Sequence, residues 1–143
     1  MNPINAAVLR IWILLTLVAV AFLSASGFPP RDARRKIACK TPEIAASCYW
    51  THGRLGSANG NPTFRLWKIG THRILGIVSG PGALERNPDD GVDPELPANV
   101  ERVFTSSSTR IFADFEVCPL EPEKPGVMQR VCIECAKNIF VEH

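Results

Sequence analysis

The chain of 143 residues carries 16 basic and 14 acidic side chains, a formal net charge of +2, and 45% hydrophobic residues. This composition excludes a wholly disordered chain, and the near balance of charges excludes a strongly basic protein of the histone type. We therefore expect no strong nucleic-acid binding, and the length allows one domain.

The chain begins with a segment typical of a secretory signal peptide, residues 1–27. Arg10 precedes the apolar run IWILLTLVAVAFL, and Ala25-Ser26-Gly27 supplies the small residues that a signal peptidase requires. At 1.5 Å per residue the run spans about 20 Å, less than the roughly 30 Å of a bilayer core. Cleavage before Phe28 is therefore favoured over a membrane anchor. We expect a secreted or periplasmic protein that meets a membrane only through an uncleaved signal.

The rest of the chain is predicted to be all-β. Residues 28–38 are proline-rich and basic and are expected to form a flexible leader, while residues 39–143 are expected to form a single β domain. A segment rich in Gly, Pro and Asp, 79–99, is predicted to be a long loop. Propensity and turn signals predict strands at Ser47–Leu55, Thr63–Ile69, His72–Val78, Val100–Phe104, Arg110–Cys118 and Gln129–Val141. Five to six short strands fit either a small antiparallel barrel of the OB-like type or a sandwich.

All five cysteines follow the signal segment, and export favours disulfide bonds. Short spacing predicts the pairs Cys39–Cys48 and Cys118–Cys132 and leaves Cys135 as a free thiol, with an exchange of Cys132 and Cys135 left open. The CxxC formed by Cys132 and Cys135 lies on a predicted strand, where residues three apart point to opposite faces. We therefore expect neither a metal site nor a cofactor there.

The dipeptide Asn59-Gly60 predicts the register of the first hairpin. As a two-residue turn it places Leu55 opposite Phe64 and Arg54 opposite Arg65.

A second turn, Gly70-Thr71, places Leu66 opposite Leu75 and Lys68 opposite Arg73. Two like charges that face each other across a ladder are unfavourable. We therefore expect a neutralising partner, which is either an external anion or the acidic part of the long loop. The candidate residues in that loop are Asp89, Asp90 and Asp93.

Because strand faces alternate, these registers sort the side chains into two faces. The aliphatic face is the predicted core: Leu55, Phe64, Leu66, Leu75 and Ile77. The other face carries Trp50, His52, Arg54, Arg65, Trp67 and His72, with Ile69 and Ile74. Indole rings stack on flat ligands and arginine forks bind carboxylate or phosphate. This face is therefore a candidate surface for an anionic or glycan ligand or a protein partner; the alternative is a second packing layer with arginines at its edge.

Signals of catalysis are missing from the sequence. It contains no GxSxG, HExxH, P-loop or GxGxxG motif. His52 and His72 fall on the first and third strands, about 10 Å apart, too far to share a metal ion. Asp114 and Glu116 alternate along one strand and are expected to face solvent. We predict no catalytic residue and no metal ligand.

Several short motifs resemble those of short secreted bacterial proteins of unknown function. They are HGRL at 52–55, Asn59-Gly60 with Pro62, FRLW at 64–67 and GTHRILG at 70–76. The resemblance extends to FEVCP at 115–119. It implies an exported bacterial protein and no particular activity.

Three functional hypotheses follow from these features. The favoured one is an exported, non-catalytic β-domain that binds a ligand or a partner. The alternatives are a small secreted enzyme, such as a hydrolase with an unrecognised site, and a structural component of the envelope. Exposure of Trp50 and Trp67 would favour the binding domain, whereas a cleft with a hydrogen-bonded polar dyad would favour an enzyme.

The signal segment generates a direct prediction. Protein purified from the exporting host should begin at Phe28, because the apolar run is too short to remain as an anchor. Intact-mass spectrometry checks this. A chain that retains Met1 and stays in the membrane fraction would show that the segment is an anchor.

Overall fold

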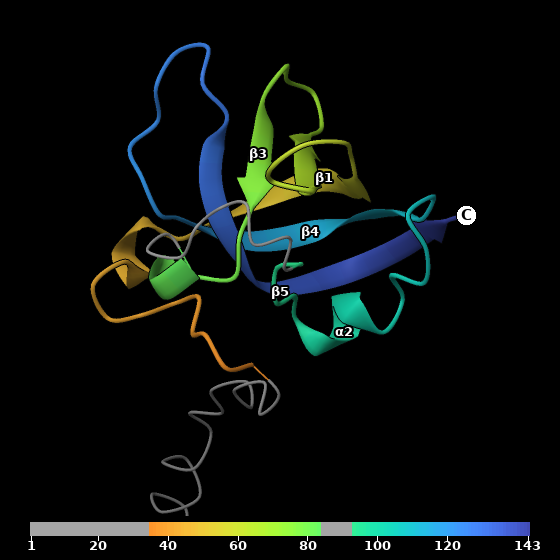
Figure 1. Ribbon diagram of the computed structural model, residues 1–143, viewed down its shortest axis with the longest axis horizontal. Coiled ribbons are helices and arrows are strands. Elements are labelled where there is room, and N and C mark those ends of the chain that lie inside the picture. Colours follow the sequence, from red (N-terminus) through yellow and green to blue (C-terminus); the bar gives the residue numbers. More distant parts are fainter. Residues whose placement is uncertain (1–34, 84–92) are drawn as a thin grey trace, which may run out of the picture. The chain divides into compact units, whose positions relative to one another are not determined.

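The computed structural model describes residues 35–83 and 93–143, and these form a closed barrel of five strands (Figure 1). The strands are β1 (Tyr49–Ser57), β2 (Phe64–Lys68), β3 (Ile74–Ile77), β4 (Arg110–Pro119) and β5 (Gln129–Glu142). Their order around the barrel is β1-β2-β3-β5-β4, and β4 pairs back with β1. The all-β prediction is confirmed, and the fold is the OB-like barrel rather than the sandwich.

One strand pair departs from the predicted antiparallel arrangement. β3 and β5 run parallel, with Leu75 opposite Gln129 and Ile77 opposite Val131. A parallel pair needs a crossover connection. Here the chain crosses between them through the long loop, a short helix and β4.

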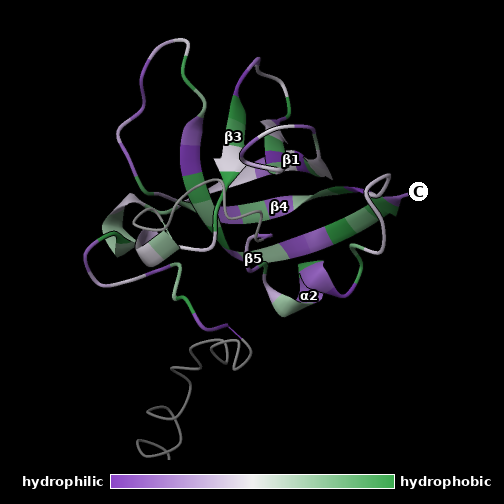
Figure 2. Ribbon diagram, in the orientation of Figure 1, coloured by the Kyte–Doolittle hydropathy of each residue, from purple (hydrophilic) through white to green (hydrophobic). Residues whose placement is uncertain are grey.

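The core lies inside the barrel and follows the period-two pattern of the strands. Figure 2 shows this alternation as bands of hydrophobic and hydrophilic residues along the ribbons. The predicted aliphatic face is confirmed as core, since its five members are all buried: Leu55, Phe64, Leu66, Leu75 and Ile77. β4 and β5 complete it with Ile111, Phe115, Val117, Val131 and Ile133.

The register of the first hairpin differs from the prediction. Leu55 pairs with Leu66, and Arg54 pairs with Trp67, so β2 is displaced by two residues along β1. The connection is wider than a two-residue turn: Ala58 N donates to Thr63 O at 2.8 Å. Because the displacement is an even number of residues, every side chain keeps its predicted face.

The second hairpin has the predicted register, with Leu66 opposite Leu75. Its turn is wider than expected: Lys68 N donates to Arg73 O at 3.0 Å, and Thr71 N donates to Lys68 O at 3.2 Å. Gly70 has φ +78, a conformation that favours glycine at this position of the turn.

The strand predicted at Val100–Phe104 is instead part of a one-turn helix, α2 (Ala98–Glu101), and the turn after it. The carbonyl of Pro97 accepts hydrogen bonds from the amides of Val100 and Glu101, so these amides are used within the helical turn and not in a strand ladder. α2 lies against β5 (Figure 1), and Asn99 Nδ2 donates to Ala136 O at 2.7 Å. The remainder of the predicted 79–99 loop is described at 79–83, which includes the turn η2 (Pro81–Ala83), and at 93–97, while 84–92 lie outside the described residues.

The last part of the predicted flexible leader is attached to the barrel. The Arg35 guanidinium donates to the carbonyls of Ile133 at 2.7 Å and Glu95 at 2.9 Å. The amides of Lys36 and Ile37 donate to a single carboxylate oxygen of Glu95. Residues 28–34, like the predicted signal segment, lie outside the described residues.

The four predicted disulfide cysteines are all bonded, but the predicted pairing is wrong. The bonds join Cys39 to Cys132 and Cys48 to Cys118, and Cys135 is the free cysteine. Short spacing misled the prediction because Cys118 and Cys132 are neighbours across β4 and β5. Each of them reaches a cysteine of the segment that contains the turn η1 (Ala45–Ser47) and packs over that end of the barrel.

The pairing can be tested by non-reducing peptide mapping, which should recover Cys39 linked to Cys132 and Cys48 linked to Cys118. The double variant Cys48→Ser/Cys118→Ser should lose about 4 kcal/mol of unfolding free energy in urea, because that bond spans 70 residues of chain. A peptide that links Cys39 to Cys48 would contradict the pairing.

Candidate functional site

The outer surface of the barrel gathers aromatic and cationic side chains from four neighbouring strands. Arg54 on β1 lies opposite Trp67 on β2 and, on its other side, opposite Phe112 on β4. Phe112 in turn lies opposite Phe140 on β5. We call this surface the aromatic face and define it by Trp50, His52, Arg54, Trp67, Phe112, Lys137 and Phe140.

The rings of the aromatic face are accessible and are interleaved with cations. Trp50 is 45% exposed and Phe140 is 67% exposed, while Trp67 is half-buried. Arg54 Cζ lies 4.7 Å from the centroid of the Trp67 ring, and Lys137 Nζ lies 4.0 Å from the Trp50 ring. These cation–π contacts hold the side chains over the sheet. Trp50 is therefore too exposed to belong to a buried second packing layer.

A polar row runs beside the aromatic rings. His52 Nδ1 lies 2.9 Å from Asp114 Oδ1, and Asn138 Nδ2 donates to Asp114 Oδ2 at 2.7 Å. The Asn138 amide, followed by His52, lowers the pKa of the Asp114 carboxyl. Asp114, predicted to be a solvated carboxylate, instead links β1 to β5. This dyad lies on an open surface, with the His52 side chain 55% exposed, and not in a cleft.

Two further arginines flank the aromatic face. Arg65 on β2 and Arg110 on β4 both lie opposite Gly56 of β1. Arg65 donates to Asn59 O at 2.7 Å, and Arg110 donates to Ser107 O at 2.9 Å. Within residues 35–83 and 93–143, neither forms an ion pair with a carboxylate.

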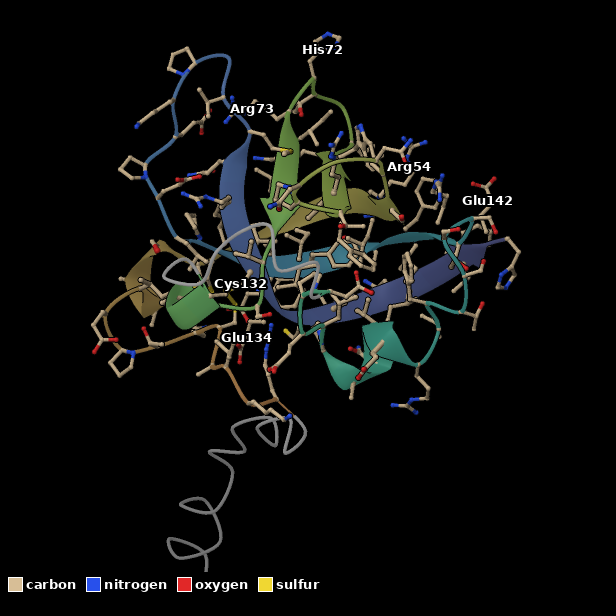
Figure 3. The ribbon with its side chains drawn as sticks, viewed as in Figure 1. Arg54, His72, Arg73, Cys132, Glu134 and Glu142 are labelled. Atoms are coloured by element: carbon tan, nitrogen blue, oxygen red, sulfur yellow. A yellow bond between two sulfur atoms is a disulfide. The ribbon has the colours of Figure 1, made fainter. Side chains whose placement is uncertain are left out.

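Three predicted site residues lie away from the aromatic face, at the tip of the second hairpin (Figure 3). His72 projects from the turn and is exposed. Lys68 Nζ lies 4.9 Å from the ring of Tyr49. Arg73 pairs with Glu123 at 3.0 Å. The opposed charges of Lys68 and Arg73 thus have separate partners.

Within residues 35–83 and 93–143, the acid that pairs with Arg73 is Glu123, in the connection between β4 and β5. Of the three acids expected in the predicted loop, Asp89 and Asp90 lie outside the described residues and Asp93 is exposed. The predicted loop at 79–99 was one of the two expected sources of a neutralising charge, and it follows β3 directly along the chain. The connection between β4 and β5 reaches the same end of the barrel because β5 starts beside β3.

The free thiol of Cys135 lies in an acidic environment. Its Sγ is 3.5 Å from Glu116 Oε2, and Lys40 Nζ is 2.6 Å from Glu116 Oε1. Burial, assisted by the Glu116 carboxylate, raises the pKa of Cys135 to about 11. The thiol is therefore protonated at neutral pH and is a poor nucleophile. The sulfurs of Cys39, Cys118 and Cys132 lie within 4.8 Å of one another, but all three are held in disulfides.

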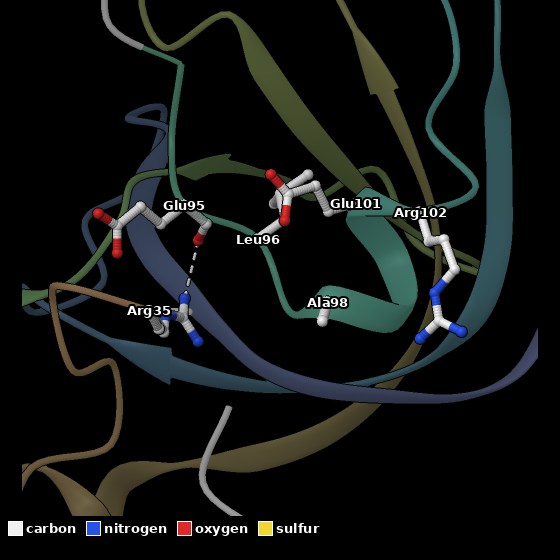
Figure 4. A pocket seen from close by; sticks show the side chains of 6 residues that line it. All are labelled: Arg35, Glu95, Leu96, Ala98, Glu101 and Arg102. Carbon is white, nitrogen blue, oxygen red and sulfur yellow. Dashed lines mark hydrogen bonds between the residues drawn. The ribbon is translucent and has the colours of Figure 1, made fainter. Parts of the chain in front are cut away.

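A cavity of about 260 Å³ lies beside α2 (Figure 4). Its lining comes from the attached leader and the α2 region: Arg35, Glu95, Leu96, Ala98, Glu101 and Arg102. The Arg35 guanidinium is committed to backbone carbonyls there. None of the aromatic-face residues lines this cavity.

Comparisons with family models, with curated proteins and with solved structures find no match for this chain. Across the described ranges, no helix combines the length and the apolar character needed to cross a bilayer.

The environment of Cys135 predicts its reactivity. Alkylation by iodoacetamide should be slow at pH 8 and should accelerate up to about pH 11, because only the thiolate reacts. Glu116→Gln removes a carboxylate that opposes ionisation and should move this profile to lower pH, whereas Glu123→Gln, on a remote connection, should not. Mass spectrometry of the alkylated peptide gives the rates. A wild-type rate that levels off near pH 8.5, the range of an ordinary thiol, would contradict the assignment.

Proposed function

We propose that this protein is an exported, non-catalytic binding domain whose aromatic face binds an extended ligand or a macromolecular partner. The observation that carries the proposal is the exposure of Trp50 and Phe140 on a sheet surface where Arg54 and Lys137 already stack on rings. Aromatic residues and arginine are enriched at interfaces, and exposed apolar patches mark binding surfaces.

The barrel supports this use of the surface. Trp67, Arg54 and Phe112 project from three strands whose backbones are hydrogen-bonded to one another. A ligand that binds such side chains orders few additional groups, so less of the binding free energy is lost to conformational entropy. The outer surface of a barrel suits a polymer or a protein better than a small molecule, which favours concave sites.

Three features support an extracytoplasmic location. The two disulfide bonds are typical of proteins that fold in an oxidising compartment. Residues 1–27 have the pattern of a signal peptide. The motifs at 52–76 resemble those of secreted bacterial proteins. Together they favour a secreted or periplasmic protein of a bacterium.

The enzyme alternative has weaker support. Its best candidate is the His52–Asp114 dyad, which is exposed on the aromatic face and connects strands through Asn138. The free thiol that could serve as a nucleophile has a raised pKa. An interfacial role for His52, as a hydrogen-bond partner of the ligand, fits this arrangement better than acid–base chemistry.

The proposal can be tested by co-sedimentation of the purified protein with the washed envelope and extracellular material of its producing cells. Trp50→Ala/Phe140→Ala should bind at least tenfold more weakly, since truncation of two interfacial aromatics costs on the order of 2 kcal/mol or more. Val127→Ala is the matched control, because Val127 is 52% exposed but lies on the connection between β4 and β5. Equal binding of the double variant and the wild type, with unchanged melting, would contradict the proposal.

A further inference from the structure

The aromatic face is bordered along one side by a row of arginines. Along β1, Gly56 lies two residues beyond Arg54 on the same outer side of the strand, and it lies opposite Arg65 and Arg110. A Cβ at Gly56 would lie 2.9 Å from Cδ of Arg110, so the arginine chain lies across the glycine. Strand spacing of about 4.8 Å therefore places the backbones of Arg65 and Arg110 on the two sides of β1 near its end, with Arg54 two residues earlier on β1 itself.

Within residues 35–83 and 93–143, Arg54, Arg65 and Arg110 form no salt bridge, whereas three other basic residues each do. Arg73 pairs with Glu123, Arg130 with Glu121 and Lys40 with Glu116.

Across residues 35–83 and 93–143, Arg54 makes no hydrogen bond or ion pair, and its contact is the ring of Trp67. Arg65 and Arg110 are held by backbone carbonyls, which orient a guanidinium without neutralising its charge. Glu142 lies opposite Arg110 on β5 but forms no ion pair with it. The three guanidinium groups therefore have no salt-bridge partner among the described residues, and their N–H groups are donors that suit a carboxylate.

The other side of the aromatic face carries one cation, Lys137, beside a set of hydrogen-bonding groups. His52, Asp114 and Asn138 form one connected chain there. A ligand that lies along the rings would thus meet guanidinium groups on one side, and on the other side a carboxylate and an amide that suit hydroxyl groups, next to a single lysine. A chain of acidic sugars has this chemistry, because each unit presents an apolar ring face, hydroxyl groups and a carboxylate.

We infer that the aromatic face binds an acidic polysaccharide, with uronate carboxylates at Arg54, Arg65 and Arg110 and sugar rings against Trp67, Phe112 and Phe140. The inference rests on the proposed function and names its ligand class. Single-stranded nucleic acid also combines rings with anionic groups. The geometry favours the sugar, since the Asp114 carboxylate, held by His52 and Asn138, can accept hydrogen bonds from the several hydroxyl groups that each sugar unit carries.

The test measures binding of the full-length secreted protein to two polyuronates, alginate and polygalacturonate, by isothermal titration calorimetry. Neutral dextran and an oligothymidylate serve as comparison ligands. Polyuronate binding should weaken when salt rises from about 50 to 200 mM, as expected for multiple ionic contacts. Dextran and oligothymidylate should bind at least tenfold more weakly than the better polyuronate.

Two variants with the same change in charge separate a site from a general effect of charge. Arg54→Ala should weaken polyuronate binding roughly tenfold, since a charge-assisted contact is lost. It should leave the melting temperature nearly unchanged, because Arg54 has no hydrogen bond to lose. Arg102→Ala, on the exposed residue that follows α2, should bind within twofold of the wild type. Glu142→Gln removes a negative charge beside Arg110 and should strengthen binding.

Three results would overturn the inference: no binding to either polyuronate, equal weakening by Arg54→Ala and Arg102→Ala, or tighter binding to oligothymidylate. The proposed function is judged separately. If Trp50→Ala/Phe140→Ala still abolishes co-sedimentation with envelope material while neither polyuronate binds, the binding domain stands and the ligand class is wrong. If polyuronate binding depends on Arg54 but co-sedimentation does not depend on Trp50 and Phe140, the ligand class stands and the proposed surface is wrong.

Discussion

The antiparallel pairing of β1 with β4 is the constraint on which both the fold and the candidate site depend. It joins two strands that are distant in the sequence, from Tyr49 opposite Val117 to Gly56 opposite Arg110. On the inner side it closes the barrel around Leu55 and Phe115, which are fully buried. On the outer side the same pairing creates the His52–Asp114 contact and the neighbouring Arg54 and Phe112. A displacement of this pairing would therefore disrupt the core and the aromatic face together.

The disulfide bonds reinforce this pairing at one end. Cys48 directly precedes β1, and its partner Cys118 follows Val117, so the bond continues the ladder beyond its last pair. The second bond ties Cys39 to Cys132, which lies opposite Cys118 on β5. Three strands are thus connected covalently, directly or through the η1 segment, at a buried cluster of sulfur atoms. In a small domain with a modest core, such cross-links supply stability that apolar burial alone does not provide.

What could be predicted from the sequence was local. The period-two pattern identified the core face of the first three strands, and the even displacement of the first hairpin left that assignment intact. Trp50, His52, Arg54 and Trp67 were therefore found on one surface. Phe112, Lys137 and Phe140 were missed because they reach that surface only through the pairing of β1, β4 and β5. One signal was available in the sequence: Phe112 alternates with Arg110 and Asp114, which indicates an aromatic ring on the outer face of that strand. This pattern does not reveal which strand lies beside it.

The difference between local patterns and contacts distant in the sequence also explains two wrong predictions: the disulfide pairing, and a strand where the short helix α2 lies. Loop closure favours contacts close in sequence, which is why Cys118 was assigned to Cys132. In the folded chain these two are indeed neighbours across the sheet, but each also faces a cysteine of the N-terminal segment, and sequence spacing carries no information about that contact. Val100 has the apolar character of a strand residue, yet it follows Pro97 and fills the core from a helical turn. In both cases the tertiary contact outweighed the local pattern.

An accessible aromatic surface carries a risk of aggregation, and the charges on the aromatic face oppose it. Arg54 lies over Trp67 and Lys137 over Trp50, so each indole is covered on one side by a side chain that retains its hydration. Charges interspersed among apolar groups oppose non-specific association of two such faces, because like cations would meet. An acidic ligand, as proposed above, would reverse this effect, since its carboxylates would convert the same cations from mutually repelling groups into binding partners. The cations that oppose association of two such faces would thus also select an anionic ligand, so the exposure of Trp50 and Phe140 needs no separate protective element.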